Sequence, residues 1–354
     1  MRTTLVFLLA VLVAASGAAQ ASRHRLQPAG DLPNPYRTIE NHFKLAEGRW
    51  WESASAVDID ADGTSVWVAD RCAADNCAGS RLNPVLKFDA GGNLVRRFGE
   101  RMFNLPHGIH VDRDGNVWVT DAEGPAEGPN EANASRLGKG HAVYKFSPDG
   151  KVLLTLGTPG VAGDGTGERL NEPCDVATAP NGDIFVADGH SGQDPNAPAH
   201  TVARIAKFTK EGRFLMSWGR LGGDPGEFRT PHGLAFDSRG RLLVADRGND
   251  RIQIFSQEGT FLGAWRQFGR VSGIFIDGND ALYAADSESD DRSNPGWARG
   301  VRIGSAADGR VRYFIPAPDA EGTALIEGVA ADVHGAVFTA AIRGGALALK
   351  KHVR

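Results

Sequence analysis

Two stretches decide the fold: Pro106-His107-Gly108-Ile109-His110-Val111-Asp112 and Pro231-His232-Gly233-Leu234-Ala235-Phe236-Asp237. Each continues through a turn with glycine into a second apolar segment that ends in aspartate, at residues 117–121 and 242–246. Apolar arms rich in Val, Ile, Trp and Leu on either side of such a turn predict a β-hairpin. A hairpin that occurs twice in one chain indicates a repeat architecture.

Further copies of this hairpin fill the rest of the chain. Its second arm occurs at residues 66–70, 117–121, 184–188, 242–246 and 282–286, and in a degenerate form at 337–341. Several copies are followed by a third and a fourth strand separated by another glycine turn. Repeats of four antiparallel strands predict one all-β domain over residues 22–354, a six-bladed β-propeller. The segment at 36–45, before the first blade, is expected to complete the last blade, whose edge would otherwise lack a partner.

Residues 1–21 have the pattern of a secretory signal peptide. Arg2 precedes an apolar run at 5–15, and Ala19-Gln20-Ala21 is a cleavage site of the small-x-small type. The run is too short to span a bilayer, and no later segment reaches about 18 apolar residues, so we expect no membrane span. The mature chain is therefore expected to be secreted or periplasmic; the alternative is a retained anchor helix.

The three cysteines fit an oxidising compartment. Cys72 and Cys77 enclose four residues and are expected to form a disulfide, which leaves Cys174 unpaired. A metal site built on these two cysteines is the weaker alternative, because no second pair completes four ligands.

Composition narrows the range of partners. The net charge is -4 and the basic residues are scattered, so neither nucleic acid nor an anionic membrane is expected as a partner. A glycine count of 45 and 41% hydrophobic residues suit an all-β protein with many tight turns. We expect a monomer.

One position recurs near the start of every innermost strand, five residues before the aspartate that ends the strand. In the third blade Ala177-Thr178-Ala179-Pro180 replaces this ending, so the alignment there allows a difference of one residue. In blade order it is occupied by Ser55, His107, Cys174, His232, Ser272 and Glu327. Alternate blades of a six-fold ring are related by about 120°, so His107, His232 and Glu327 are expected to meet on the axis. Such a three-ligand set with open positions suits catalytic Zn or non-haem Fe(II). The alternative for each histidine is a hydrogen-bonded structural residue.

The rim of the same face carries further candidate residues. Long segments rich in Gly and Pro follow the second strands there, at 122–140, 189–203 and 287–300. Loops of this length on a rigid scaffold are typical of a binding site, here for a small-molecule or peptide substrate. Arg71 and Arg247 each follow a strand-ending aspartate, where a guanidinium can bind a carboxylate through two hydrogen bonds, and His190 occupies the corresponding place in the third blade. A structural ion pair is the alternative for each arginine.

The repeats resemble NHL repeats, and four phrases resemble the lyase domain of peptidylglycine α-amidating enzymes. These phrases lie at residues 105–108, 171–176, 218–228 and 230–247. The resemblance covers blades two to four well and the whole six-blade plan loosely. The lyases of this family bind Zn through three histidines on alternate blades, carry a structural Ca, and cleave a peptidyl-α-hydroxyglycine to a peptide amide and glyoxylate.

Carried over residue by residue, the resemblance makes His107 and His232 zinc ligands and makes Arg71 and Arg247 the active-site arginines. The family's third histidine falls on Glu327. Zinc sites of two histidines and one glutamate are known, so this substitution is chemically tolerable.

The family's active-site tyrosine falls at or near His190, and a histidine can accept a proton near neutral pH. The resemblance therefore implies a secreted, metal-dependent C–N lyase. In it the metal at His107, His232 and Glu327 lowers the pKa of a substrate hydroxyl, His190 accepts the proton, and an arginine holds the substrate carboxylate.

Two other classes remain open. The first is a secreted NHL propeller that binds a protein or peptide on its looped face without chemistry. The second is a metal-dependent six-bladed hydrolase or lactonase, which commonly arranges carboxylates and Asn around axial Ca; the histidine-rich set of this chain disfavours it.

Overall fold

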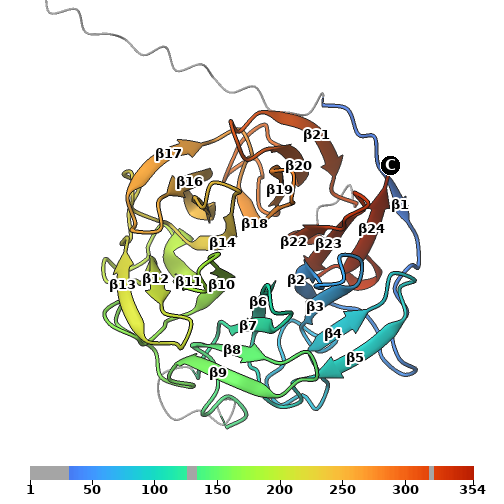
Figure 1. Ribbon diagram of the computed structural model, residues 1–354, viewed down its shortest axis with the longest axis horizontal. Coiled ribbons are helices and arrows are strands. Elements are labelled where there is room, and N and C mark those ends of the chain that lie inside the picture. The colour runs from blue at the N-terminus through green and yellow to red at the C-terminus, as the bar shows by residue number, and fades with distance from the viewer. Residues whose placement is uncertain (1–31, 126–133, 319–322) are drawn as a thin grey trace, which may run out of the picture.

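The computed structural model describes residues 32–125, 134–318 and 323–354, which form six sheets arranged in a ring (Figure 1). Each sheet contains four strands, and every strand pairs antiparallel with its neighbour. The predicted all-β, six-bladed propeller is confirmed. The expected signal peptide at residues 1–21 lies outside the described residues.

The strands of each blade follow one another from the axis outward. The innermost strands are β2 (Ala54–Ile59), β6 (Pro106–Val111), β10 (Pro173–Thr178), β14 (Pro231–Phe236), β18 (Val271–Ile276) and β22 (Leu325–Ala331). The second strands are β3 (Val66–Asp70), β7 (Val117–Asp121), β11 (Ile184–Asp188), β15 (Leu242–Asp246), β19 (Ala281–Asp286) and β23 (Val337–Ile342). The third strands are β4 (Val85–Phe88), β8 (Ala142–Phe146), β12 (Arg204–Phe208), β16 (Arg251–Phe255), β20 (Gly300–Ser305) and β24 (Leu349–Val353). The outer strands are β5 (Leu94–Phe98), β9 (Val152–Gly157), β13 (Phe214–Trp218), β17 (Phe261–Trp265), β21 (Val311–Pro316) and β1 (Arg37–Ile39).

Helical structure in the described ranges is limited to the short 3-10 helices η3 (Ser191–Gln193), η4 (Arg247–Asn249) and η5 (Gly345–Leu347). None of the helices described there has the length and hydropathy of a membrane span.

The last blade joins the two ends of the described chain. β1 pairs antiparallel with β24, and the order in this sheet is β1-β24-β23-β22. An ion pair of 2.6 Å between Lys350 Nζ and Glu40 Oε2 lies beside the pairing. The ring is thus closed by hydrogen bonds between strands far apart in sequence, and the edge of β24 is covered.

The hydrophobic core is divided into layers between neighbouring blades. The second strands are buried at every position in blades one to four, which explains why they read as unbroken apolar runs instead of alternating. Aromatic rings from adjacent blades meet in these layers, as Phe98 of β5 and Phe146 of β8 do, with ring centroids 5.0 Å apart. The packing fixes each blade against the next and so fixes the positions of residues on the axis.

Buried aspartates at the ends of the second strands hold the loops of one face. Asp188 accepts the backbone N–H of Asn171 at 2.6 Å and pairs with Arg204 at 2.8 Å. Asp246 likewise accepts the N–H of Arg229 at 2.8 Å. Because these carboxylates are buried and hydrogen-bonded, the loops that follow start from fixed points.

Candidate functional site

The same irregularity occurs in the innermost strand of all six blades. The pairing between first and second strands shifts register once in each blade, and the shift skips Ser55, His107 with Gly108, Cys174, His232, Ser272 and Glu327. A β-bulge releases a residue from the ladder and redirects its side chain. All six aligned residues line one small cavity of about 40 Å³.

Close approach of neighbouring blades positions two of the histidines. The Nδ1 atom of His107 lies 2.8 Å from the carbonyl oxygen of Cys174, and that of His232 lies 3.2 Å from the carbonyl oxygen of Ser272. A Cβ atom on Gly108 would lie 2.6 Å from the Cys174 oxygen, so the residue after this histidine must be small for the contact to form. These bonds require hydrogen on Nδ1, which leaves the Nε2 lone pair of both rings free to accept.

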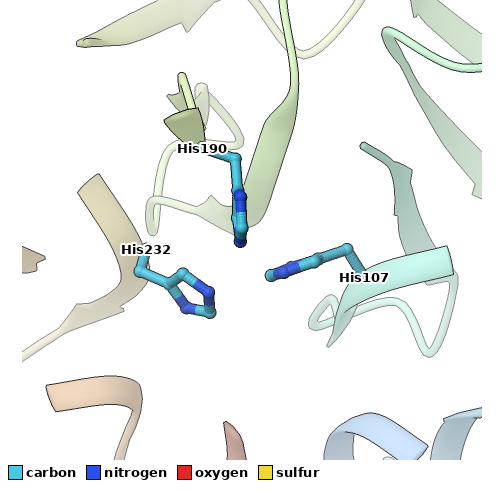
Figure 2. Close-up of side chains that lie close together, drawn as sticks. All are labelled: His107, His190 and His232. Carbon is cyan, nitrogen blue, oxygen red and sulfur yellow. The ribbon is translucent and has the colours of Figure 1, made fainter. Parts of the chain in front are cut away.

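The side chains of His107, His190 and His232 converge from three consecutive blades (Figure 2). One ring nitrogen from each lies within 4.8 Å of the others. The ring centroids are 4.7 Å apart for His107 and His232, 5.2 Å for His107 and His190, and 5.5 Å for His190 and His232. This is a set of three nitrogen donors of the kind that binds Zn or Fe(II).

Burial and neighbouring positive charge keep the three imidazoles neutral. Burial, and then the charge of Arg71, lowers the pKa of His107 to about 3. Burial and Arg247 lower the pKa of His190 and of His232 well below the ordinary value. The buried Nε2 atom of His107 has no hydrogen-bond partner in the described structure. A buried acceptor without a donor is costly, and a metal ion would satisfy it.

Arg247 lies against two of the three rings. Its guanidinium donates to Nε2 of His232 at 2.8 Å and to Nε2 of His190 at 3.2 Å. It also donates from Nε to Gln193 Oε1 at 3.1 Å. The resemblance makes Arg247 a carboxylate-binding residue, and the structure places it at the centre of the site.

Glu327 lies beside the histidines but is paired with arginines. Its Oε2 atom is 3.2 Å from Arg71 Nη2, and its Oε1 atom is 3.4 Å from Arg247 Nη1 and 4.0 Å from His232 Nε2. Glu327 is not part of the group of mutually close donor atoms, whereas His190 is. Its role as a metal ligand stays a prediction, and its surroundings favour pairing with the two arginines.

Two further features border the site. Cys72 and Cys77 form the predicted disulfide next to Arg71, and Cys174 is a buried free thiol. Burial raises the pKa of Cys174 well above its usual value, so this thiol stays protonated and its residue contributes through its carbonyl oxygen.

A pocket of about 480 Å³ adjoins His190 on the looped face. The segment that begins with η3 forms one wall, through residues such as Gln193, Pro195 and Pro198, and Arg270 and Glu288 line the pocket with them. The sequence alone does not single out Gln193, Arg270 or Glu288. The one available signal is that Arg270 lies two residues before the recurrent axial position of its blade.

Comparison with known proteins agrees with the propeller fold. A family model described as NHL repeat matches residues 228–255, which contain β14, β15 and β16. The chain is 35% identical to peptidyl-α-hydroxyglycine α-amidating lyase 1 of Drosophila melanogaster over 185 residues, 49% of this chain and 29% of that protein. The chain is a six-bladed propeller with one match to the NHL repeat, and about half of it is similar to the amidating lyases. It is also 30% identical to NHL repeat-containing protein 3 of Mus musculus over 214 residues, 59% of this chain and 54% of the relative.

The match spans about half the length of the mouse NHL repeat-containing protein and a smaller share of the fly lyase. Solved structures extend the likeness over nearly the whole propeller. A gluconolactonase from Xanthomonas campestris has a TM-score of 0.57 at 17% identity and covers 92% of this chain and 96% of its own. A streptogramin B lyase has a TM-score of 0.52 at 14% identity, with coverages of 90% and 97%. At such low identity these structures show the shared fold alone.

Proposed function

We propose that the chain is a metal-dependent lyase that cleaves the C–N bond of an α-hydroxylated amide. The observation that carries this proposal is the group of three neutral imidazoles, one with an unpartnered buried Nε2 atom, at the centre of a propeller that resembles the amidating lyases. Two of the three, His107 and His232, also match the zinc ligands implied by the resemblance.

The residues present fit a zinc ion. His107, His190 and His232 would hold it, and each would offer a neutral nitrogen because burial lowers its pKa. The bonds from Arg247 to His190 and His232 would have to break to make room for it. Fe(II) is the alternative metal for such a set, and a structural calcium remains an expectation from the resemblance. When bound, zinc supplies a Lewis acid that lowers the pKa of a hydroxyl group.

The reaction breaks one C–N bond and one O–H bond and forms one C=O π bond and one N–H bond. The hydroxyl oxygen of the substrate forms a C=O bond, the C–N electron pair leaves with nitrogen, and the hydroxyl proton ends on that nitrogen. Negative charge develops on the carbonyl oxygen of the departing amide. The guanidinium of Arg247 is buried beside the site, and once its bonds to His190 and His232 are broken it would be free to donate to that oxygen. His190, expected as the proton acceptor, is on this proposal a metal ligand.

We also propose that the protein is secreted or periplasmic. A disulfide between Cys72 and Cys77 suits a secreted or periplasmic protein, since such bonds persist in oxidising compartments.

A direct assay tests this function. Zinc-loaded protein is incubated with N-benzoyl-α-hydroxyglycine and with N-benzoyl-α-hydroxyglycinamide, and release of benzamide is followed. We expect benzamide from at least one of them, and a loss of at least 100-fold in His107→Ala and in His190→Ala. His334→Ala, an exposed histidine away from the cluster, is the matched control. Absence of benzamide from both compounds would overturn the proposal.

One observation favours a second candidate, a propeller that binds a ligand without chemistry. Arg247 satisfies the Nε2 atoms of His190 and His232 through hydrogen bonds that need no metal. The name of the mouse relative also states no reaction. A wild-type protein that binds no zinc after reconstitution would support this candidate.

A further inference from the structure

The positive charges around the three histidines are already paired with carboxylates of the chain itself. Arg71 and Arg247 share Glu327, with one carboxylate oxygen on each guanidinium, at 3.2 Å and 3.4 Å. The side chains of all three are buried, with exposed fractions of 8%, 1% and 4%. The resemblance assigns these arginines to a substrate carboxylate, and Glu327 lies where such a group would be expected.

The third arginine near the site is paired as well. Arg270 Nη1 lies 3.1 Å from Asp250 Oδ1, and its Nε lies 3.4 Å from Glu288 Oε2. Glu288 also faces Arg247, with 3.6 Å between Oε1 and Nη1. Each of these arginines in the described structure therefore has an internal carboxylate partner.

We propose that the substrate of this site is uncharged at its α-substituent: an α-hydroxylated amide that carries an amide, an ester or a similar neutral group where an α-hydroxyglycine carries its carboxylate. This inference rests on the proposed lyase function and specifies its substrate class. Glu327 is the specificity-determining residue, because its charge occupies the two arginines.

Electrostatics gives the physical reason. A substrate carboxylate entering this site would have to displace Glu327 or lie close to it. Displacement leaves a buried carboxylate without a partner, and two carboxylates at short range repel each other strongly in a poorly solvated site. Either route is unfavourable, so binding of a substrate with a charged α-substituent is weakened relative to binding of a neutral one.

A neutral substrate meets donors that remain available. The Nε–H of Arg71 is buried and has no hydrogen-bond partner in the described structure. A carbonyl oxygen can accept that bond without bringing a charge into the site. The adjoining pocket of about 480 Å³, with Pro195, Ala197 and Pro198 in its lining, has room for an uncharged acyl group.

Equilibrium binding of unreactive analogues tests this inference separately from catalysis. N-benzoylglycine and N-benzoylglycinamide lack the α-hydroxyl and cannot be cleaved. Their affinities are measured by calorimetry on metal-free protein, so that a carboxylate gains nothing from a metal ion. We expect the wild type to bind the glycinamide at least tenfold more tightly. Glu327→Gln, which removes the carboxylate that Arg71 and Arg247 share, is expected to bind N-benzoylglycine at least tenfold more tightly than the wild type does.

Two further variants complete the design. Glu327→Asp keeps the charge and is expected to keep the preference for the glycinamide, which guards against a folding defect in Glu327→Gln. Glu211→Gln removes an exposed carboxylate and is the control for net charge. The inference is overturned if the wild type binds N-benzoylglycine as tightly as the glycinamide, if it binds neither, or if Glu327→Gln leaves the ratio unchanged. Benzamide release from N-benzoyl-α-hydroxyglycine in preference to its amide would retain the lyase and reject this substrate class.

Discussion

Individual side chains of the site owe their state to burial. The three clustered imidazoles are neutral because transfer of a charged ring into this part of the protein is unfavourable and because Arg71 and Arg247 add positive charge nearby. Hydrogen bonds to carbonyl oxygens set the tautomers of His107 and His232. These residues are therefore prepared to donate electron pairs without first losing a proton.

This state predicts an unusual pH dependence of zinc binding. Protons compete with a metal only as the pH approaches the pKa of the free ligand, which for His107 is lowered to about 3 from an ordinary value near 6.5. We expect zinc to be retained from pH 8 down to about pH 5, as measured with a zinc indicator while circular dichroism monitors the fold. Half-release near pH 6.5 from folded protein would contradict the proposed state of the rings.

The buried side chain of Arg302 is expected to stabilise the fold. It is fully buried, pairs with Asp286 at 3.0 Å, and stacks against the rings of Trp297 and Phe314. Arg302→Met would leave the buried Asp286 carboxylate without this ion pair, so we expect the free energy of unfolding to fall by about 3–5 kcal/mol in urea denaturation.

The exposed Arg310, in the turn after the same strand, is the matched control, and Arg310→Met should change the free energy of unfolding by less than about 0.5 kcal/mol. Equal effects of the two substitutions would show that the buried pair contributes nothing specific.

At the scale of elements, a bulged innermost strand and a tight second strand form a unit that presents one residue per blade to the axis. The outer strand of each blade has a different role: it pairs with the third strand and so covers the edge of that strand. In the last blade this cover is β1, which comes from the other end of the chain (Figure 1).

Removal of β1 is expected to open the ring. A chain that starts at residue 41 leaves the edge of β24 unpaired, whereas a chain that starts at residue 32 keeps the pairing of Arg37 with Val353. We expect the shorter chain to melt at least roughly 5 °C lower and to self-associate in light scattering. Identical melting curves for the two chains would mean that the strand pairing does not stabilise the closed ring.

For the whole molecule, the repeat plan and the ring of axial residues could be predicted because both follow from local spacing. The apolar arms and the aspartate at a fixed distance align Ser55, His107 and the other axial residues without knowledge of tertiary contacts. Which of these residues contact one another depends on how far each side chain extends across the axis. Local spacing in the sequence does not determine this. His190 lies in a loop outside the strand alignment, and Glu327 is met by two long arginine side chains from other blades.

We propose that three histidines form a metal centre and that Glu327 lies outside it. Elemental analysis of the purified, zinc-reconstituted protein tests this directly, with His190→Ala, Glu327→Gln and His334→Ala measured beside the wild type. We predict about one zinc per chain in the wild type, in Glu327→Gln and in His334→Ala, and almost none in His190→Ala. A wild type without zinc, or zinc that is lost in Glu327→Gln and kept in His190→Ala, would show that the three histidines do not form the metal centre.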